Sequence, residues 1–348
     1  MRLVSIGLFL FVCVLMVPLS CGQPNTNDEP AVEGVSSTTD SGNNETTTPD
    51  ISTTKEESKE EPPEETKRPC FLEQKFEKGQ RPDYEQFNPK FGSHCVGTNH
   101  QDIQGVEKVV FVGDSITAGT PPTDPKLFYR NTTTEALKKK FGDNLIIKDC
   151  SKWGARTDDL LLNPHKQLKN CIPDDVETKK TLIIFTAGGN DLQSIAKDNQ
   201  KGVPMAKLLA KAQKAISLLR DAVVWAKDPK RFPNGSYVIF GNVYEYTDGT
   251  GDVKSCPASK AVGLDKPWPE GRPILVALNE GFMKIAVDTN SDMIFLLEEF
   301  CGHGFRNEDP QNECYQPGAE QWFDFTCTHP NPTGHDQITF MVMSVVNE

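Results

Sequence analysis

Short apolar runs alternate with longer amphipathic segments along the chain from residue 108 onward. The runs are rich in β-branched and aromatic residues and are bounded by Gly, Asn or Asp, a pattern that is typical of buried strands. It predicts five strands, at residues 109–112, 145–148, 181–186, 237–240 and 293–297.

Between these runs, apolar residues recur at helical spacing. Gly142 provides a stop for the first helix, and Pro204 suits the first turn of the longest one. The predicted helices cover residues 127–141, 157–162, 204–227, 274–287 and 336–346. Strands alternating with helices indicate an α/β fold, a three-layer α/β/α sandwich around a central, mostly parallel five-stranded sheet. In such a sheet the chemistry gathers beyond the carboxyl ends of the strands.

The first residues have the pattern of an export signal. Arg2 precedes an apolar stretch at 8–19, and small residues follow at Ser20-Cys21-Gly22. We therefore assign residues 1–20 to a signal peptide, which is too short to span a membrane stably. Either Cys21 becomes a lipidated N-terminus that anchors the protein to a membrane, or cleavage after Gly22 releases it. Both alternatives predict an extracytoplasmic protein.

Residues 21–67 have the composition of a disordered linker. The segment 23–67 lacks aromatic residues and holds twelve acidic and three basic ones, so it supplies most of the chain's net charge of −12. Such a composition cannot bury enough apolar area to offset chain entropy. The folded domain at 68–348 is then close to neutral, which argues against a nucleic-acid partner. We expect this domain to be a monomer.

Eight cysteines lie in the predicted domain, an even number that favours four disulfides in an exported chain. The spacing leaves their pairing open. A metal site is the rival interpretation, but the sequence holds no Cys-x-x-Cys pair and no His-x-x-x-His. We expect no metal and no other cofactor. The cysteines are Cys70, Cys95, Cys150, Cys171, Cys256, Cys301, Cys314 and Cys327.

The candidate nucleophile is Ser115, in Gly113-Asp114-Ser115 directly after the first predicted strand. A buried strand that turns sharply into a helix lifts a serine hydroxyl out of the sheet. It also points backbone N–H groups at a developing oxyanion. The motif alone is weak, because Gly-Asp-Ser occurs in many ordinary turns.

Two further strand ends carry candidate oxyanion donors. Asn190 follows the third strand, and its amide can donate to an oxyanion; the alternative is that Asn190 or Asp191 caps the next helix. Gly154 follows the second strand and can offer a backbone N–H, or be a plain turn glycine. Nearby, Trp153 can line a substrate pocket or belong to the core.

The candidate general base is His329, in a proline-bearing loop near the C-terminus. A serine hydroxyl is a poor nucleophile until an adjacent imidazole accepts its proton. The other histidine of this loop, His335, is placed at the start of the last predicted helix, where a capping or solvated role is expected.

Together these four elements resemble the SGNH hydrolase superfamily, also called GDSL esterases and lipases. The signature residues occur in the family's order, Ser115, Gly154, Asn190 and His329, within roughly residues 105–345. The resemblance implies the family's flavodoxin-like fold, with Ser115 as nucleophile and His329 as general base. It also implies an oxyanion hole of the Ser115 and Gly154 N–H groups and the Asn190 side chain.

The sequence departs from the family at the catalytic acid. The family has Asp three residues before the histidine, whereas this position is Thr326 here. The nearest acid is Asp324, five residues before His329. Three alternatives remain for orienting the ring: Asp324, which we prefer, a backbone carbonyl, or the Thr326 hydroxyl.

The leading hypothesis is an exported serine esterase or lipase that acts on a small-molecule, lipid or glycan ester. One alternative is a carbohydrate O-deacetylase of the same superfamily. Another is a surface binding protein with decayed catalysis, which the missing acid would explain.

Overall fold

Five parallel strands form the centre of the fold. The computed structural model describes residues 96–162, 164–261, 263, 264, 266–312 and 314–348. The predicted signal peptide, the predicted linker and Cys21 lie outside these residues. The strand order is β2-β1-β3-β4-β5, and every neighbouring pair is parallel. The strands are β1 Lys108–Gly113, β2 Ile146–Asp149, β3 Thr181–Thr186, β4 Ser236–Gly241 and β5 Asp292–Ile294.

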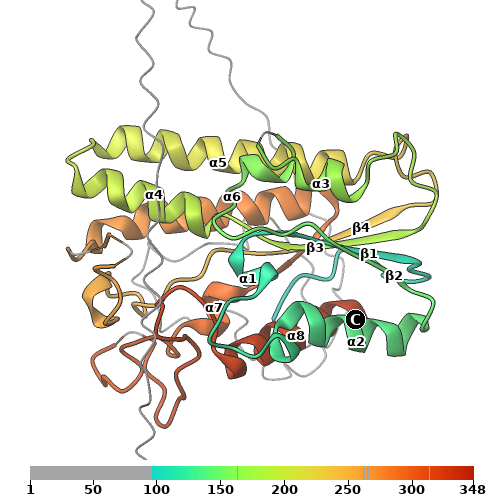
Figure 1. Ribbon diagram of the computed structural model, residues 1–348. Helices are drawn as coiled ribbons and strands as arrows, with labels where there is room; N and C mark the ends of the chain where they lie inside the picture. Colours follow the sequence, from blue (N-terminus) through green and yellow to red (C-terminus); the bar gives the residue numbers. More distant parts are fainter. Residues whose placement is uncertain (1–95, 163, 262, 265, 313) are drawn as a thin grey trace, which may run out of the picture. The chain divides into compact units, whose positions relative to one another are not determined.

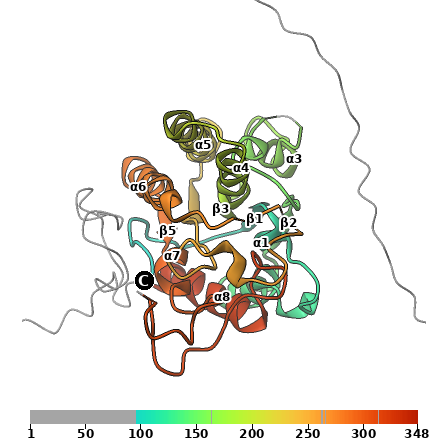
Figure 2. The ribbon, with the colours of Figure 1, turned by 90° about the vertical axis from the view of Figure 1, so that its left-hand side faces the viewer.

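Helices cover both faces of the sheet, as Figures 1 and 2 show. One face carries α2 Tyr129–Phe141, α7 Leu296–Phe300 and α8 Pro332–Asn347. The other carries α3 Gln167–Cys171, α4 Gly189–Gln200, α5 Met205–Ala226 and α6 Arg272–Thr289. The short elements are α1 Ser115–Ala118 and the 3₁₀ turns Pro125–Leu127, Asp158–Leu160, Val253–Ser255 and Pro269–Gly271. The predicted three-layer α/β/α sandwich is confirmed.

The central strands are continuous apolar runs because helices cover both of their sides. Every residue of β1 and of β3 is buried. Beside β5, residues 96–98 run antiparallel: Gly97 bridges Ile294, and Thr98 donates from its N–H to the Met293 carbonyl at 3.0 Å.

The last predicted strand is wrong in its second half. The run predicted at 293–297 leaves the sheet after Ile294, and residues 296–300 form α7. All of Met293, Leu296 and Leu297 are buried, and a short buried run looks the same in a strand and in a helix turn.

Two helix starts also differ from prediction. Pro204 is the N-cap of α5 rather than a member of its first turn. The last helix begins at Pro332, four residues before the predicted start, because the Asn331 side chain caps it by accepting from the Gly334 N–H at 2.9 Å. The predicted helix at 157–162 is only the 3₁₀ turn Asp158–Leu160.

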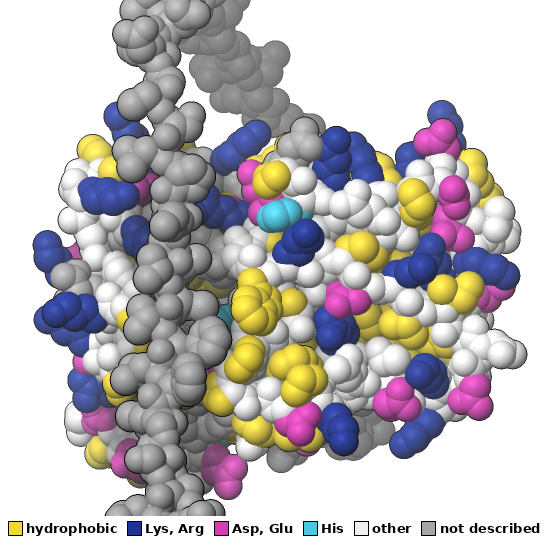
Figure 3. Space-filling model, in the orientation of Figure 1, with side chains coloured by type: hydrophobic (Ala, Val, Ile, Leu, Met, Phe, Trp, Pro, Cys, Tyr) yellow, Lys and Arg dark blue, Asp and Glu magenta, His cyan; other side chains and the backbone are white. Residues whose placement is uncertain are grey.

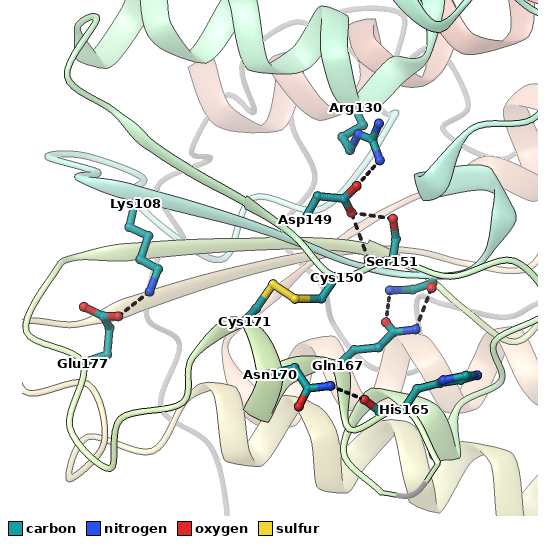
Figure 4. The surroundings of a disulfide bond; sticks show 11 residues. Lys108, Arg130, Asp149, Cys150, Ser151, His165, Gln167, Asn170, Cys171 and Glu177 are labelled. Atoms are coloured by element: carbon teal, nitrogen blue, oxygen red, sulfur yellow. Dashed lines mark hydrogen bonds and ion pairs between the residues drawn. A yellow bond between two sulfur atoms is a disulfide. The ribbon is translucent and has the colours of Figure 1, made fainter.

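Three disulfides join six of the cysteines: Cys150–Cys171, Cys256–Cys327 and Cys301–Cys314. The remaining two of the predicted eight, Cys70 and Cys95, lie outside the described residues. Figure 4 shows the first bridge, which ties the end of β2 to α3 beside the side chain of Gln167.

Gln167 fixes the carboxyl end of β1, where the candidate nucleophile follows. Its Oε1 accepts from the Gly113 N–H at 2.5 Å, and its Nε2 donates to the Gly113 carbonyl at 2.9 Å (Figure 4). Gly113 has a φ of 110°, and a Cβ there would lie 2.2 Å from the Thr186 carbonyl oxygen. A side-chain amide therefore takes the place of a strand partner at this turn.

Replacing this amide by an apolar side chain of similar size should destabilise the fold. In Gln167→Leu the buried Gly113 N–H loses its acceptor, which costs about 1–3 kcal/mol of unfolding free energy. Gln213→Leu, on the exposed side of α5, is the matched control and should change it by less than about 0.5 kcal/mol. Urea denaturation measures both; equal values for the two variants would contradict the role of Gln167.

Candidate active site

Ser115 is the first residue of α1, immediately after the end of β1. The preceding Asp114 is the N-cap of this helix, and its Oδ1 accepts from the Ile116 N–H at 3.0 Å. The same oxygen accepts from the Thr186 hydroxyl at 2.7 Å, which ties the turn to the end of β3. The strand-to-helix turn predicted from the sequence is thus present, and it places Ser115 at the carboxyl edge of the sheet.

His329 faces this serine. Its Nε2 lies 2.9 Å from Ser115 Oγ, which joins residues 214 positions apart in the sequence. The loop that carries the imidazole is a narrow backbone arch: Phe323 and Pro330 form an antiparallel bridge, and the Asp324 N–H donates to the His329 carbonyl at 2.9 Å. The structure therefore brings the predicted nucleophile and base together.

The His329 loop is held by contacts from the segment after β4. The Tyr244 hydroxyl donates to the Thr328 carbonyl at 2.9 Å, and its ring stacks on Phe300 with 4.8 Å between the centroids. The disulfide Cys256–Cys327 fastens the same loop two residues before His329. Tyr244 was missed in the sequence analysis because residues 242–272 show little periodicity.

Among the described residues, the Asp324 carboxylate, which the sequence favoured as the acid, makes no hydrogen bond to the His329 ring. The Asp324 Oδ1 accepts from the Thr326 N–H at 2.7 Å and from the Thr326 hydroxyl at 2.5 Å. That hydroxyl lies 2.6 Å from His329 Nδ1. The tight turn from Asp324 to Thr326 occupies the carboxylate, and the shorter Thr326 side chain reaches the ring instead.

Two of the predicted oxyanion donors, Asn190 and Gly154, lie in the first turn of α4 and in the loop after β2. Asn190, in the first turn of α4, donates from Nδ2 to the Ala155 carbonyl at 2.9 Å. Gly154 precedes Ala155 in the loop after β2 and has a φ of 75°, and a Cβ added there would meet no atom beyond its chain neighbours within 4 Å. Across the described part of the chain, the N–H groups of Ser115 and Gly154 have no hydrogen-bond acceptor.

Asp191 holds the start of α4 to the loop after β2. Its carboxylate accepts from the Thr157 N–H at 3.0 Å and from the Thr157 hydroxyl at 3.1 Å. Asn190 and Asp191 lie inside α4, whose N-cap is Gly188, so neither caps the helix as the alternative interpretation held. The sequence could have pointed to Asp191, because it adjoins Asn190. It does not show that Asp191 pairs with Thr157 in the loop after β2.

Burial shifts the pKa values of three titratable groups in the site. It lowers the pKa of His329 below its ordinary value, although the charge of Asp324 acts in the opposite direction. Burial raises the pKa of Asp114 to about 7 and that of Asp191 to about 6, against the hydrogen bonds that each carboxylate accepts. A low imidazole pKa keeps His329 neutral, which a general base requires.

His335 differs from its predicted role, because it is fully buried in α8 and is not solvated. Its Nδ1 accepts from the Tyr129 N–H at 3.2 Å, so it satisfies the start of α2 rather than its own helix. Burial lowers the pKa of His335 to about 4. His335 therefore has a structural role, and among the described residues it makes no hydrogen bond to Ser115.

Two aromatic side chains beside the site are exposed. Trp153, next to Gly154, is 64% exposed while its Nε1 donates to the Gly119 carbonyl at 2.9 Å. Phe325, between Asp324 and Thr326, is 66% exposed. On the face shown in Figure 3, hydrophobic side chains gather near the centre, and basic and acidic ones are interspersed around them. Among the described residues, no group of three or more His, Cys, Asp or Glu is arranged to hold a metal ion.

Residues 111–337 match the sequence profile of the GDSL-like Lipase/Acylhydrolase family. This segment is more than half of the chain and includes every residue of the site. The chain belongs to this family. Membership in the GDSL-like family places it among the carboxylic ester hydrolases and confirms the resemblance inferred from Ser115, Gly154, Asn190 and His329. No curated protein matches the chain.

Several solved structures are similar to this GDSL-like chain. A gut microbial diltiazem-metabolizing enzyme shares 15% identity over 71% of this chain and 49% of its own, with a TM-score of 0.46. The chain thus spans about half of that enzyme. Phospholipase A1 from Streptomyces albidoflavus NA297 shares 16% identity over 69% and 99%, with a TM-score of 0.43. The acetyl xylan esterase AlAXEase shares 18% identity over 69% and 99%, with a TM-score of 0.44.

The raised pKa of Asp114 predicts how stability depends on pH. Its pKa is about 7 in the folded protein and 3.8 without the fold, so the folded state holds the extra proton between these values. The contribution of Asp114 to stability is then fully present below pH 3.8 and is lost as the pH rises to about 7, by at most about 1.4 kcal/mol per pH unit.

Asp114→Asn removes this titration while keeping an acceptor for the Ile116 N–H. Relative to the wild type, its unfolding free energy should therefore increase progressively between pH 4 and about 7. Asp143→Asn, at an exposed position, is the control and should show no such trend. Denaturant titrations across this range measure both, and a constant difference for Asp114→Asn would refute the buried titration.

Proposed function

We propose that the protein is an exported serine esterase that hydrolyses carboxylic esters through an acyl-enzyme on Ser115. The observation that carries the proposal is the 2.9 Å contact between Ser115 Oγ and His329 Nε2 at the carboxyl edge of the sheet. A nucleophile and base within hydrogen-bond reach are the essential pair of this chemistry.

In the proposed reaction, Ser115 Oγ attacks the ester carbonyl carbon while His329 Nε2 takes the hydroxyl proton. The tetrahedral intermediate then collapses, the imidazolium gives the proton to the departing alcohol oxygen, and the acyl group remains on Ser115. Water, deprotonated by the same nitrogen, attacks the acyl carbonyl; the bond from the acyl carbon to Ser115 Oγ breaks, the imidazolium returns the proton to Oγ, and the acid is released. The low pKa of His329 supports its part as the base.

The oxyanion would be stabilised by neutral donors. The N–H groups of Ser115 and Gly154 are available, and the Asn190 amide has a second N–H besides the one given to Ala155. The positive φ of Gly154 turns its peptide in a way that side-chain-bearing residues rarely adopt. Asp191 and Asn190 fix this loop, so the donors are oriented before the substrate arrives.

Export is supported by the three disulfides, since such bridges persist in oxidising compartments. Within the described residues, every helix falls short of the length and apolarity needed to cross a membrane. Lipidation of Cys21 remains the proposed means of any membrane attachment, and a monomer without a nucleic-acid partner remains the expectation.

A carbohydrate O-deacetylase is the second candidate, and the exposed rings of Trp153 and Phe325 favour it. Both adjoin catalytic-site residues and present large apolar faces to solvent, as a platform for a sugar ring would. Comparing rates on acetylated glycans and on p-nitrophenyl esters, in the wild type and in Trp153→Ala, distinguishes a glycan ester from a simple acyl ester.

Ser115→Ala should abolish hydrolysis of p-nitrophenyl acetate and butyrate and leave the fold intact, because only the attacking oxygen is lost. Ser217→Ala, at an exposed position of α5, is the matched control and should keep the wild-type rate. Purified full-length protein and the circular dichroism spectra of both variants provide the measurement. A wild-type protein that hydrolyses none of the esters tested would favour a binding protein with decayed catalysis.

Asn190→Ala should lower kcat roughly 10²–10³-fold with little change in KM, as expected for the loss of one oxyanion donor. Asn199→Ala, near the other end of α4, controls for changes to the helix. Steady-state kinetics on p-nitrophenyl butyrate separates the two constants. A change confined to KM would make Asn190 a substrate-binding residue instead.

A further inference from the structure

We propose that Thr326 is a positioning residue that connects Asp324 to His329 and fixes which nitrogen of the imidazole carries the proton. The proposal rests on the function proposed above and concerns its third member, at the position where the family has an acid. The observation is a continuous chain of contacts: Asp324 Oδ1 to Thr326 Oγ1 at 2.5 Å, and Thr326 Oγ1 to His329 Nδ1 at 2.6 Å.

The direction of each hydrogen bond follows from what the groups can donate. A carboxylate only accepts, so the Thr326 hydroxyl spends its one proton on Asp324 Oδ1. Toward His329 the hydroxyl can then only accept, and Nδ1 must be the nitrogen that carries the proton. This leaves a lone pair on Nε2, which faces Ser115 Oγ at 2.9 Å. The relay therefore selects the tautomer that a general base needs.

Asp324 is held so that it serves this hydroxyl. Its backbone N–H donates to the His329 carbonyl at 2.9 Å, so the acid and the base are fixed on opposite sides of the same arch. Its Oδ1 also accepts from the Thr326 N–H at 2.7 Å. The residue is 6% exposed, and among the described residues its Oδ2 has no hydrogen-bond partner. Because a buried carboxylate is costly unless it accepts hydrogen bonds, the bond from the Thr326 hydroxyl stabilises the Asp324 carboxylate.

During the reaction the imidazole becomes positive. The contacts from Asp324 through Thr326 to His329 then stabilise this charge without transferring a second proton. The Nδ1–H strengthens its bond to Thr326 Oγ1, while Asp324 polarises the hydroxyl from behind. The carboxylate acts over a longer path than in a direct acid–imidazole pair. Thr326 should therefore contribute orientation first and charge stabilisation second.

Three variants test the relay in the full-length protein. Thr326→Val keeps the shape and removes the hydroxyl, Thr326→Ser restores it, and Thr328→Val is the matched control in the same arch. Within the described residues, the hydroxyl of Thr328 makes no hydrogen bond. We expect Thr326→Val to lower kcat by roughly 10–100-fold with KM unchanged, Thr326→Ser to recover most of the loss, and Thr328→Val to match the wild type.

Asp324→Asn distinguishes a relay from a direct acid. The new side chain keeps an oxygen that accepts from the Thr326 hydroxyl, so the tautomer survives and kcat should fall less than in Thr326→Val. A direct acid would give the reverse order, with Asp324→Asn costing up to about 10⁴-fold. That order, or a fully active Thr326→Val, would overturn the proposal.

The tautomer itself supplies a readout that a purely structural role would not move. In ¹⁵N-histidine-labelled protein, the His329 signals, assigned with His329→Gln, should show Nδ1 protonated in the wild type and in Thr326→Ser. Thr326→Val should lose this preference; an unchanged tautomer would refute the relay. If the wild type is inactive and Ser115 unreactive, the proposed function fails, whereas activity that depends on Ser115 but not on Thr326 rejects only the relay.

Discussion

The site depends on one contact, between Ser115 Oγ and His329 Nε2, which joins segments 214 residues apart. A contact between segments so far apart costs chain entropy. To keep it, the long connections between β4 and α6 and between α7 and α8 must be ordered. The contacts that restrain the histidine side are correspondingly dense. Tyr244 binds the backbone of the arch, and the disulfide Cys256–Cys327 ties the arch to the loop after β4. Asn331 caps the helix α8, which begins directly after the arch. The serine side needs fewer restraints, because β1 is paired on both edges and Gln167 closes its end.

The parallel sheet gives this contact its chemical surroundings. Carboxyl ends of β1, β2 and β3 meet at one edge, so the loops after them bring Ser115, Gly154 and Asn190 to one place. The acids Asp114 and Asp191 are buried at this edge, and their raised pKa values show that their charged forms are disfavoured there. Each side chain nevertheless holds a segment of the site: Asp114 accepts from Ile116 and Thr186, and Asp191 accepts from Thr157 in the loop after β2.

The sheet and the layers could be predicted from the sequence, because buried parallel strands appear as apolar runs. The Ser115–His329 pair could be predicted because Ser115 directly follows the end of such a run and His329 lies in a late loop. Prediction from the sequence failed where tertiary contacts decide. Leu296 and Leu297, which end the predicted strand, belong to the helix α7 instead. The start of α8 was missed although Asn331-Pro332 is a helix-start signal. Asp324 was preferred over Thr326 as the partner of the ring, but the place of Thr326 between Asp324 and His329 depends on the arch closed by Phe323 and Pro330. Disulfide pairing is likewise a property of the folded chain.

We infer that Ser115, His329 and three oxyanion donors form one reaction centre. A crystal structure of the protein inhibited by a phosphonate ester tests it most directly, because the bound phosphonyl group imitates the tetrahedral intermediate. We expect phosphorus bonded to Ser115 Oγ, with one phosphonyl oxygen about 2.7–3.1 Å from the N–H groups of Ser115 and Gly154 and from Asn190 Nδ2. A phosphonate bonded to another residue, or a phosphonyl oxygen that contacts none of these donors, would contradict it.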